Sequence, residues 1–140
     1  MLPSGLPENV ADEEALARFL MSSSHYNATM VKPAAFLPNP KARMTTSVFR
    51  HGAEPRESLI QIAGEQRPDV TAYGAAICKA VAVRSAKLDV IADEPPPLHA
   101  NIVGWPVNGT DQMLEKAEQK RAALVLVSRC TLVLFESKAP

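Results

Sequence analysis

The stretch His99-Ala100-Asn101-Ile102-Val103-Gly104-Trp105-Pro106 closes a run of strand-forming sequence that begins at Ala75. It follows a rigid Pro95-Pro96-Pro97 segment and holds the single Trp of the chain. Gly frees the backbone, and Pro cannot donate a hydrogen bond to a neighbouring strand. The pattern therefore predicts an apolar strand over about residues 99–103 that ends at a structurally fixed point.

Two apolar-rich segments precede that strand, at 77–83 and 88–92, and the polar Arg84-Ser85-Ala86-Lys87 joins them. Their spacing predicts a hairpin over residues 75–93, followed by the third strand without a crossover helix. Consecutive strands with helices on either side indicate an α+β fold, an antiparallel sheet of three to five strands with about three helices packed on one face. A doubly wound α/β sheet is the alternative.

The first half of the chain predicts two helices and a strand. Asn9 can cap a helix over residues 10–22. A run of β-branched and aromatic residues predicts a strand over 45–50, and Pro55 suits the first turn of a helix that Pro68 ends. Further expectations are a shared face of Leu16, Phe19 and Leu20 in the first helix, an extended edge segment over 29–36, a loop over 37–40, and a core stripe of Leu59, Ile62 and Ala63 in the second helix.

A last helix is expected after the Asn108-Gly109 turn, with Thr110 or Asp111 as its cap. Beyond Leu124 the pattern is apolar on every face, which indicates deep burial or a partner surface. Periodicity leaves open whether residues 131–135 continue the helix or form a strand. The expected face of this helix comprises Leu114, Ala117, Arg121, Leu124 and Val125. Residues 1–9 are expected to form a loose leader before one domain over 10–140.

Composition places the chain among ordinary globular proteins. It has 140 residues, enough for one core, and 46% of them are hydrophobic, too many for a disordered chain. Its 15 basic and 15 acidic residues give a net charge of zero, which argues against dedicated nucleic-acid binding. Residues 32–56, however, carry five basic residues against Glu54 alone. Such a segment is either a solvated or salt-bridged face or a site for a small anionic ligand.

Localisation is inferred from what the sequence lacks. No apolar run reaches the roughly 18 residues that a membrane helix needs, and the N-terminus shows no secretory signal. We therefore expect a cytoplasmic protein without membrane contact. Cys78 and Cys130 have no CxxC spacing, which predicts two reduced thiols and no metal site. No cofactor motif is present, so we expect no cofactor.

His99 is the best single candidate for chemistry, because an imidazole titrates near neutrality and serves as acid, base or ligand. Asn101 lies on the same side of a strand as His99, since strand side chains alternate with a period of two. The ordinary interpretation is a histidine that satisfies backbone groups at a sheet edge. The adjacent acids Asp93 and Glu94 are expected to form a solvated turn.

Two arginines complete the candidate set. Arg50 leaves a strand end, where a guanidinium can bind a carboxylate or phosphate with two hydrogen bonds. Arg18 lies on an otherwise apolar segment and points either into a cleft or into water. A salt bridge to an acidic residue explains each arginine equally well. Trp105 is expected to anchor the core or its rim, with a stacking platform as the alternative.

Four short motifs are spread over roughly residues 12–125. They are Glu14-x-x-Ala17-Arg18-Phe19-Leu20, Ala35-Phe36-Leu37-Pro38, Ser47-Val48-Phe49-Arg50 and His99-Ala100-x-Ile102-x-Gly104-Trp105-Pro106. Together they resemble a family of small uncharacterised bacterial proteins, which has no established activity and therefore implies no catalytic role. The resemblance does imply that Glu14, Arg18, Arg50 and His99 recur as a polar set. Such a set favours a shared site.

Three classes of function stay open. The first is a non-catalytic accessory domain that binds a small anion at the basic segment or a protein partner at the apolar C-terminal helix. The second is a small hydrolase or transferase for a phosphorylated or nucleotide substrate, with His99 as acid or base and Arg18 and Arg50 holding the anion. The third is a nucleic-acid-associated regulatory partner. The second requires His99 and both arginines to share one hollow.

Overall fold

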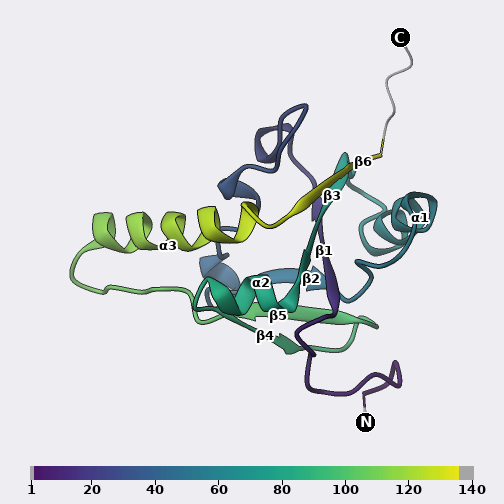
Figure 1. Ribbon diagram of the computed structural model, residues 1–140, viewed down its shortest axis with the longest axis horizontal. Helices are drawn as coiled ribbons and strands as arrows, with labels where there is room; N and C mark the ends of the chain where they lie inside the picture. The colour runs from purple at the N-terminus through teal and green to yellow at the C-terminus, as the bar shows by residue number, and fades with distance from the viewer. Residues whose placement is uncertain (1, 136–140) are drawn as a thin grey trace.

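One six-stranded antiparallel sheet forms the centre of the computed structural model, which describes residues 2–135 (Figure 1). The strand order is β4-β5-β2-β1-β3-β6. This confirms the α+β class, with one strand more than the expected upper number. The strands are β1 Ala15–Leu20, β2 Thr46–Phe49, β3 Gly74–Lys79, β4 Asp89–Ala92, β5 His99–Val103 and β6 Thr131–Leu134.

The helices lie on both faces of the sheet, and not on one face as expected. Figure 1 shows α2 (Ala80–Ser85) and α3 (Gln112–Val127) on one side of β1 and β3, and α1 (Arg56–Gln66) on the other. Strand β1 explains this arrangement, because it is apolar on both faces. Its Leu16 and Leu20 belong to the core beneath α2 and α3, whereas Ala17 and Phe19 pack with Leu59 and Ala63 of α1.

The helix expected over residues 10–22 is wrong, because that segment contains strand β1. β1 pairs with β3 along its whole length, from Ala15 opposite Lys79 to Leu20 opposite Gly74. A strand that is buried on both faces has a nearly continuous apolar sequence. Such a run also satisfies the i, i+3, i+4 spacing of a helix, so the pattern of Leu16, Phe19 and Leu20 did not distinguish the two.

The expected hairpin over residues 75–93 is also wrong. β3 is followed directly by helix α2, and β4 pairs with β5 at the far edge of the sheet. The apolar run 77–83 therefore spans the end of a strand and most of a short helix. The core that contains residues of α3 also includes three residues of this helix, Ala80, Ala82 and Val83. An uninterrupted apolar sequence does not show where a strand ends and a helix begins.

Other expectations are confirmed. A strand occupies Thr46–Phe49, α1 follows Pro55 and ends before Pro68, and β5 begins at His99. Gly104, with φ of +87°, adopts the left-handed conformation that lets the chain leave β5. Asp111 caps α3 by accepting a hydrogen bond from the Leu114 N–H at 3.0 Å. Residues 131–134, left open above, form strand β6.

The face assigned to α3 is wrong. Its buried residues are Gln119, Ala122, Ala123 and Leu126, whereas the five residues expected to share a face are all exposed. Small Ala side chains contribute little to a hydrophobic pattern, although they permit close packing. Gln119 is buried because its side-chain NH2 donates to the Pro106 carbonyl at 2.9 Å.

None of the helices within residues 2–135 combines the length and apolarity that crossing a bilayer requires.

Between β1 and β2 the chain makes three short 3-10 helices, Ser23–His25 (η1), Pro33–Ala35 (η2) and Pro40–Ala42 (η3). The extended segment expected over 29–36 is reduced to an isolated bridge between Tyr26 and Val31 before η2 begins. This region contacts α3 through η2. It also provides one wall of the cleft described below.

Gly52 gives a test of this packing. A Cβ at this position would lie 2.6 Å from the backbone N of Leu16 in β1, whereas a Cβ at Gly64 in α1 would meet nothing within 4 Å. We predict that Gly52→Ala lowers the free energy of unfolding by about 1–3 kcal/mol through overpacking. Gly64→Ala should raise it by about 0.5–1 kcal/mol, the helix preference of Ala. Urea unfolding followed by circular dichroism measures both, and equal stability of Gly52→Ala and wild type would contradict the packing.

Candidate functional site

A cleft opens where strands β1 and β2 separate. The two strands share one register pair, Ala17 with Phe49, and the side chain of Arg18 crosses the gap beyond it. Its Nε donates to the Ala35 carbonyl of η2 at 2.9 Å, and its Nη1 donates to the Ser47 carbonyl of β2 at 2.9 Å. Arg18 thus supplies donors where the ladder of backbone hydrogen bonds stops.

The half-buried Arg18 guanidinium carries a charge without an acidic partner among the described residues. Burial lowers its pKa, yet an arginine stays protonated in proteins. No carboxylate within residues 2–135 forms a salt bridge with it. Within those residues its hydrogen bonds come from Nε and Nη1, and Nη2 makes none. Arg18 lines the cleft, so Nη2 is the donor that a ligand there can use.

Ser47, His99 and Asp93 form a chain of contacts beside Arg18. Ser47 Oγ lies 2.6 Å from His99 Nε2, across the paired strands β2 and β5. His99 Nδ1 lies 2.8 Å from the Asp93 carbonyl oxygen and 3.5 Å from its Oδ2. Asn101 holds that carboxylate by donating from Nδ2 to Oδ2 at 2.8 Å. The β4–β5 hairpin brings Asp93 to His99, because the Asp93 N–H donates to the His99 carbonyl at 2.9 Å.

These contacts determine which His99 nitrogen carries the proton in the neutral ring. Nδ1 faces only acceptors, so it is the donor, and Nε2 then accepts a hydrogen bond from the Ser47 hydroxyl. Phe49 holds the ring from the side, with ring centroids 5.2 Å apart in an edge-on arrangement. The Asp93 side chain is 58% exposed, so solvent weakens its attraction to the ring and the carbonyl is the main partner.

The cleft consists of two adjoining hollows that share Arg18, Ser47, Arg67 and His99. One measures about 410 Å³ and the other about 750 Å³. The smaller hollow has apolar walls, and the larger one is rich in polar and basic groups. The walls of the smaller include Phe19, Met21, Phe49 and Pro96, and those of the larger include Lys41, Arg43, Asp93 and Asn101.

His25 of η1 also faces the smaller hollow. Burial and then the charge of Arg18 lower the pKa of His25, so its ring is neutral at pH 7. The cationic character of this hollow therefore comes from Arg18 and from Arg67, which also forms an exposed salt bridge with Asp69, 3.6 Å from its Nε. Ser47 and His99 lie at the junction of the apolar and the basic hollow.

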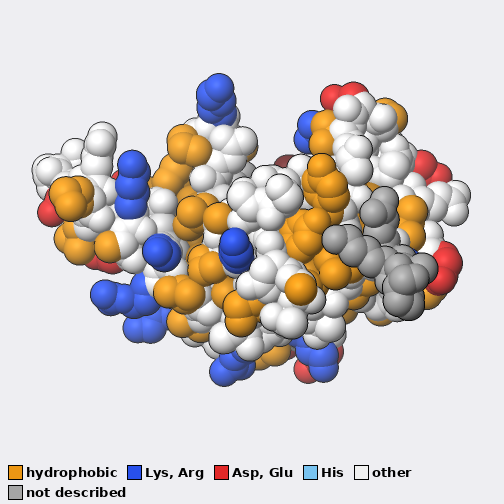
Figure 2. All heavy atoms as spheres, turned by 90° about the horizontal axis from the view of Figure 1, so that it is seen from above, with side chains coloured by type: hydrophobic (Ala, Val, Ile, Leu, Met, Phe, Trp, Pro, Cys, Tyr) orange, Lys and Arg blue, Asp and Glu red, His pale blue; other side chains and the backbone are white. Residues whose placement is uncertain are grey.

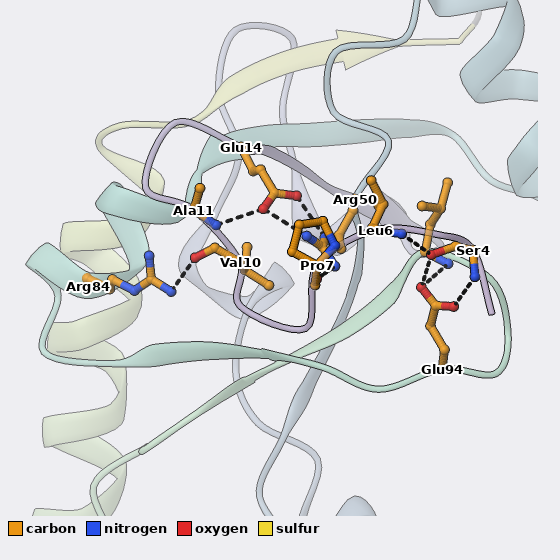
Figure 3. A network of polar contacts seen from close by, with 10 residues as sticks. Ser4, Leu6, Pro7, Val10, Ala11, Glu14, Arg50, Arg84 and Glu94 are labelled. Carbon is orange, nitrogen blue, oxygen red and sulfur yellow. Dashed lines mark hydrogen bonds and ion pairs between the residues drawn. The ribbon is translucent and has the colours of Figure 1, made fainter. Parts of the chain in front are cut away.

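The structure divides the sequence-predicted residues into two groups. It brings His99, Arg18 and Asn101 to the cleft. Glu14 and Arg50 instead bind each other away from the cleft, where Arg50 Nε and Nη2 donate to the two Glu14 oxygens at 2.7 and 2.8 Å (Figure 3). The Arg50 side chain is 1% exposed. Arg50 is therefore not available to hold an anion beside His99.

This ion pair belongs to a network that holds the N-terminal segment (Figure 3). Arg50 Nη1 donates to the Pro7 carbonyl at 2.8 Å, and the Ser4 hydroxyl donates to Glu94 at 2.6 Å. The segment expected to be a loose leader is thus tied to the sheet at two points. The acids expected in a solvated turn have partners as well, Glu94 in this network and Asp93 in the cleft.

Trp105 lies in the core beneath α2 and α3, 5% exposed, and does not line the cleft. Cys78 and Cys130 are free thiols. A hydrogen bond with Cys78, followed by burial, raises the pKa of Cys130, which makes it a poor source of thiolate. In the described part of the chain, no group of three or more His, Cys, Asp or Glu side chains could hold a metal ion.

Helix α3 exposes several apolar side chains, among them Met113, Leu114 and Leu124. On the face shown in Figure 2, apolar side chains are interspersed with Lys and Arg side chains. A partner surface on this helix stays a prediction.

Ser47, Arg67 and Asp93 are among the cleft residues that the sequence did not indicate. Ser47 stood inside a strand signal, and only the pairing of β2 with β5 places it against His99.

The Glu14–Arg50 pair predicts an acid-sensitive stability. Burial alone raises the pKa of Glu14, but hydrogen bonds from Arg50 and the Ala11 N–H, with the charge of Arg50, lower it below 4.5 overall. A lowered carboxyl pKa contributes stability that is complete above about pH 4.5 and is lost as the pH falls through the lowered value. Glu14→Gln should destabilise the fold at pH 7 by about 3 kcal/mol, because it leaves Arg50 unpaired.

The measurement is urea unfolding between pH 7 and pH 3. Glu14→Gln should lose less stability than wild type over that range, while the exposed neighbour variant Glu13→Gln should stay within about 0.5 kcal/mol of wild type at pH 7. An acid dependence of Glu14→Gln as steep as that of wild type would show that the ion pair has no such role.

The chain matches no protein-family model, no curated protein and no solved structure. The resemblance to small bacterial proteins therefore stays a prediction. What the cleft can bind or transform follows from its own residues, chiefly Arg18, Ser47 and His99.

Proposed function

We propose that this protein binds a small anionic ligand in the cleft between β1 and β2. The observation that carries the proposal is the half-buried Arg18 guanidinium, which lines both hollows and has no acidic partner within residues 2–135. A half-buried charge without a partner has lost part of its hydration, which is unfavourable. An oxyanion that enters the cleft offsets this cost with charge-assisted hydrogen bonds.

The surroundings of Arg18 support an oxyanion that carries an apolar group. Arg67, Lys41 and Arg43 add positive charge to the walls, and Asp93 is bonded to Asn101 and His99. The smaller hollow offers apolar walls from Phe19 and the aromatic ring of Phe49. A phosphate or carboxylate attached to an aromatic or aliphatic group suits both parts of the cleft.

A small hydrolase or transferase is the second candidate. The specific observation that favours it is the 2.6 Å contact between Ser47 Oγ and His99 Nε2, in the tautomer that a general base needs. The hydrolase or transferase inferred from the structure differs in one respect from the one expected from the sequence. Arg50 forms an ion pair with Glu14, so Arg18 alone of the two arginines is available to bind the anion. We place either function in the cytoplasm, because Cys78 and Cys130 are free thiols.

Replacing Arg18 tests the binding proposal. Arg18→Gln should weaken the binding of inorganic phosphate and of phenyl phosphate at least about tenfold, which corresponds to about 1.4 kcal/mol. The reason is that it removes a half-buried cation that lines both hollows and has no acidic partner within residues 2–135. Calorimetric titration measures the affinity directly. Phenyl phosphate should bind more tightly than phosphate, since its ring reaches the apolar hollow.

Arg129→Gln is the matched control, because Arg129 is exposed and lines neither hollow. Wild type and this control should show the same affinity, and phosphate should raise the unfolding temperature of both. Arg18→Lys retains a charge and should keep part of the affinity. If Arg18→Gln binds phosphate as well as wild type, or if wild type binds neither anion, the proposal is wrong.

A further inference from the structure

We propose that Ser47 is a nucleophile, activated by His99, that cleaves a carboxylic ester with an apolar acyl group and a negatively charged alcohol part. The inference rests on the cleft of the proposed function, but it adds a reaction, a nucleophile and a substrate class. No known nucleophile motif surrounds Ser47, and its contact with the imidazole comes from the pairing of β2 with β5.

The geometry meets the requirements for an activated serine. A weakly acidic hydroxyl attacks only when a base takes its proton, and that base must be within hydrogen-bond reach and correctly oriented. His99 Nε2 lies 2.6 Å from Ser47 Oγ, and the Asp93 carbonyl fixes the Nδ1–H tautomer at 2.8 Å. Asp93 Oδ2, 3.5 Å from Nδ1, faces the positive charge that forms on the ring. Asp93 is therefore a positioning residue.

Both reacting side chains stand on strands, which hold them more firmly than loops do. Ser47 and His99 lie on the face of the sheet opposite the larger core, next to Phe49. Arg18 Nη1 donates to the Ser47 carbonyl, and both residues line both hollows. We assign Nη2 of Arg18 as the donor for the oxyanion of a tetrahedral intermediate.

The reaction balances without a further co-reactant except water. As Ser47 Oγ bonds to the ester carbonyl carbon, its proton passes to His99 Nε2 and the carbonyl oxygen becomes an oxyanion beside Arg18. The intermediate then expels the alcohol oxygen, which takes the proton from Nε2 and leaves an acyl group on Ser47. Water attacks this acyl group with its proton going to Nε2, the bond to Ser47 Oγ breaks, and Oγ recovers the proton. The products are a carboxylic acid and an alcohol.

The two hollows define the substrate class, because Ser47 and His99 lie where they join. Phe19, Met21 and Phe49 line the hollow that suits the acyl group. Lys41 and Arg43 line the other, which suits an alcohol part with a carboxylate or phosphate. The scissile bond of such an ester then lies at the junction, with one half in each hollow.

Labelling with a fluorophosphonate tests the nucleophile, because this probe forms a covalent bond with an activated serine. The intact protein is treated and the modified peptide is identified by mass spectrometry. We expect Ser47 to react at least about a hundredfold faster than Ser128 of the same chain, since general-base help contributes about 10²–10⁴. Ser128 is a matched reference, because its hydroxyl donates to the Val125 carbonyl at 2.6 Å and has no imidazole partner.

Two variants complete the test, each checked for folding by circular dichroism. Ser47→Ala should lose the fast adduct, and His99→Gln should slow it at least about a hundredfold. An unlabelled Ser47 in wild type, or an equal rate in His99→Gln, overturns the inference. Phosphate binding by Ser47→Ala separates the two proposals. If this variant binds phosphate but Ser47 of the wild type is not labelled, only the nucleophile proposal is rejected. If the wild type is labelled but neither protein binds phosphate, only the binding function is rejected.

The substrate class is measured with two esters, phenyl butyrate and its analogue that carries a carboxylate on the phenyl ring. Wild type should hydrolyse the charged ester with a kcat/KM at least about tenfold higher, because Lys41 and Arg43 face its carboxylate. The double variant Lys41→Gln/Arg43→Gln should lose this preference. If the wild type prefers the neutral ester, or if the double variant keeps the preference for the charged ester, the assignment of the basic hollow is wrong.

Discussion

The Arg18 guanidinium lies at the point where β1 and β2 part, and the shape of the cleft depends on it. Its hydrogen bonds to Ala35 and Ser47 satisfy carbonyls of η2 and β2 across a gap that the sheet does not close. A lysine has neither the planar fork nor the number of donors needed for this role. Because the remaining donors face the cleft, the same residue that joins the strands also gives the cleft its positive charge. Structure and proposed function therefore depend on one side chain.

Fold class could be predicted from the sequence, but the connectivity could not. Local signals were sufficient for β2, for α1 after Pro55 and for the end of β5 at Gly104, because turn and strand propensities act over a few residues. β1 was missed because it lies in the middle of the sheet and is apolar on both faces. The boundary between β3 and α2 was missed because a buried strand and a buried helix both consist of apolar residues. Long-range pairing decides such cases.

The site was predicted in part for the same physical reason. His99 and Arg18 stood out because an imidazole and a lone guanidinium are chemically distinctive. Ser47 did not, since a serine within a strand is ordinary until its neighbour across the sheet is known. Arg50 was placed in the site on its chemistry and on the family resemblance, with a salt bridge to an acidic residue as the alternative. The structure has that alternative, a bidentate bond to Glu14, which lies 36 residues away in sequence.

The most direct measurement is a long-range ¹H–¹⁵N spectrum of the histidine rings, recorded during a titration with inorganic phosphate. Neutral His99 should show the Nδ1–H tautomer, because the Asp93 carbonyl accepts that proton and Ser47 donates to Nε2. Its Nε2 signal and the Nε–H signal of Arg18 should shift together as phosphate binds. A neutral His99 with the proton on Nε2, or His99 and Arg18 signals that do not change when phosphate is added, would contradict a common site for these two residues.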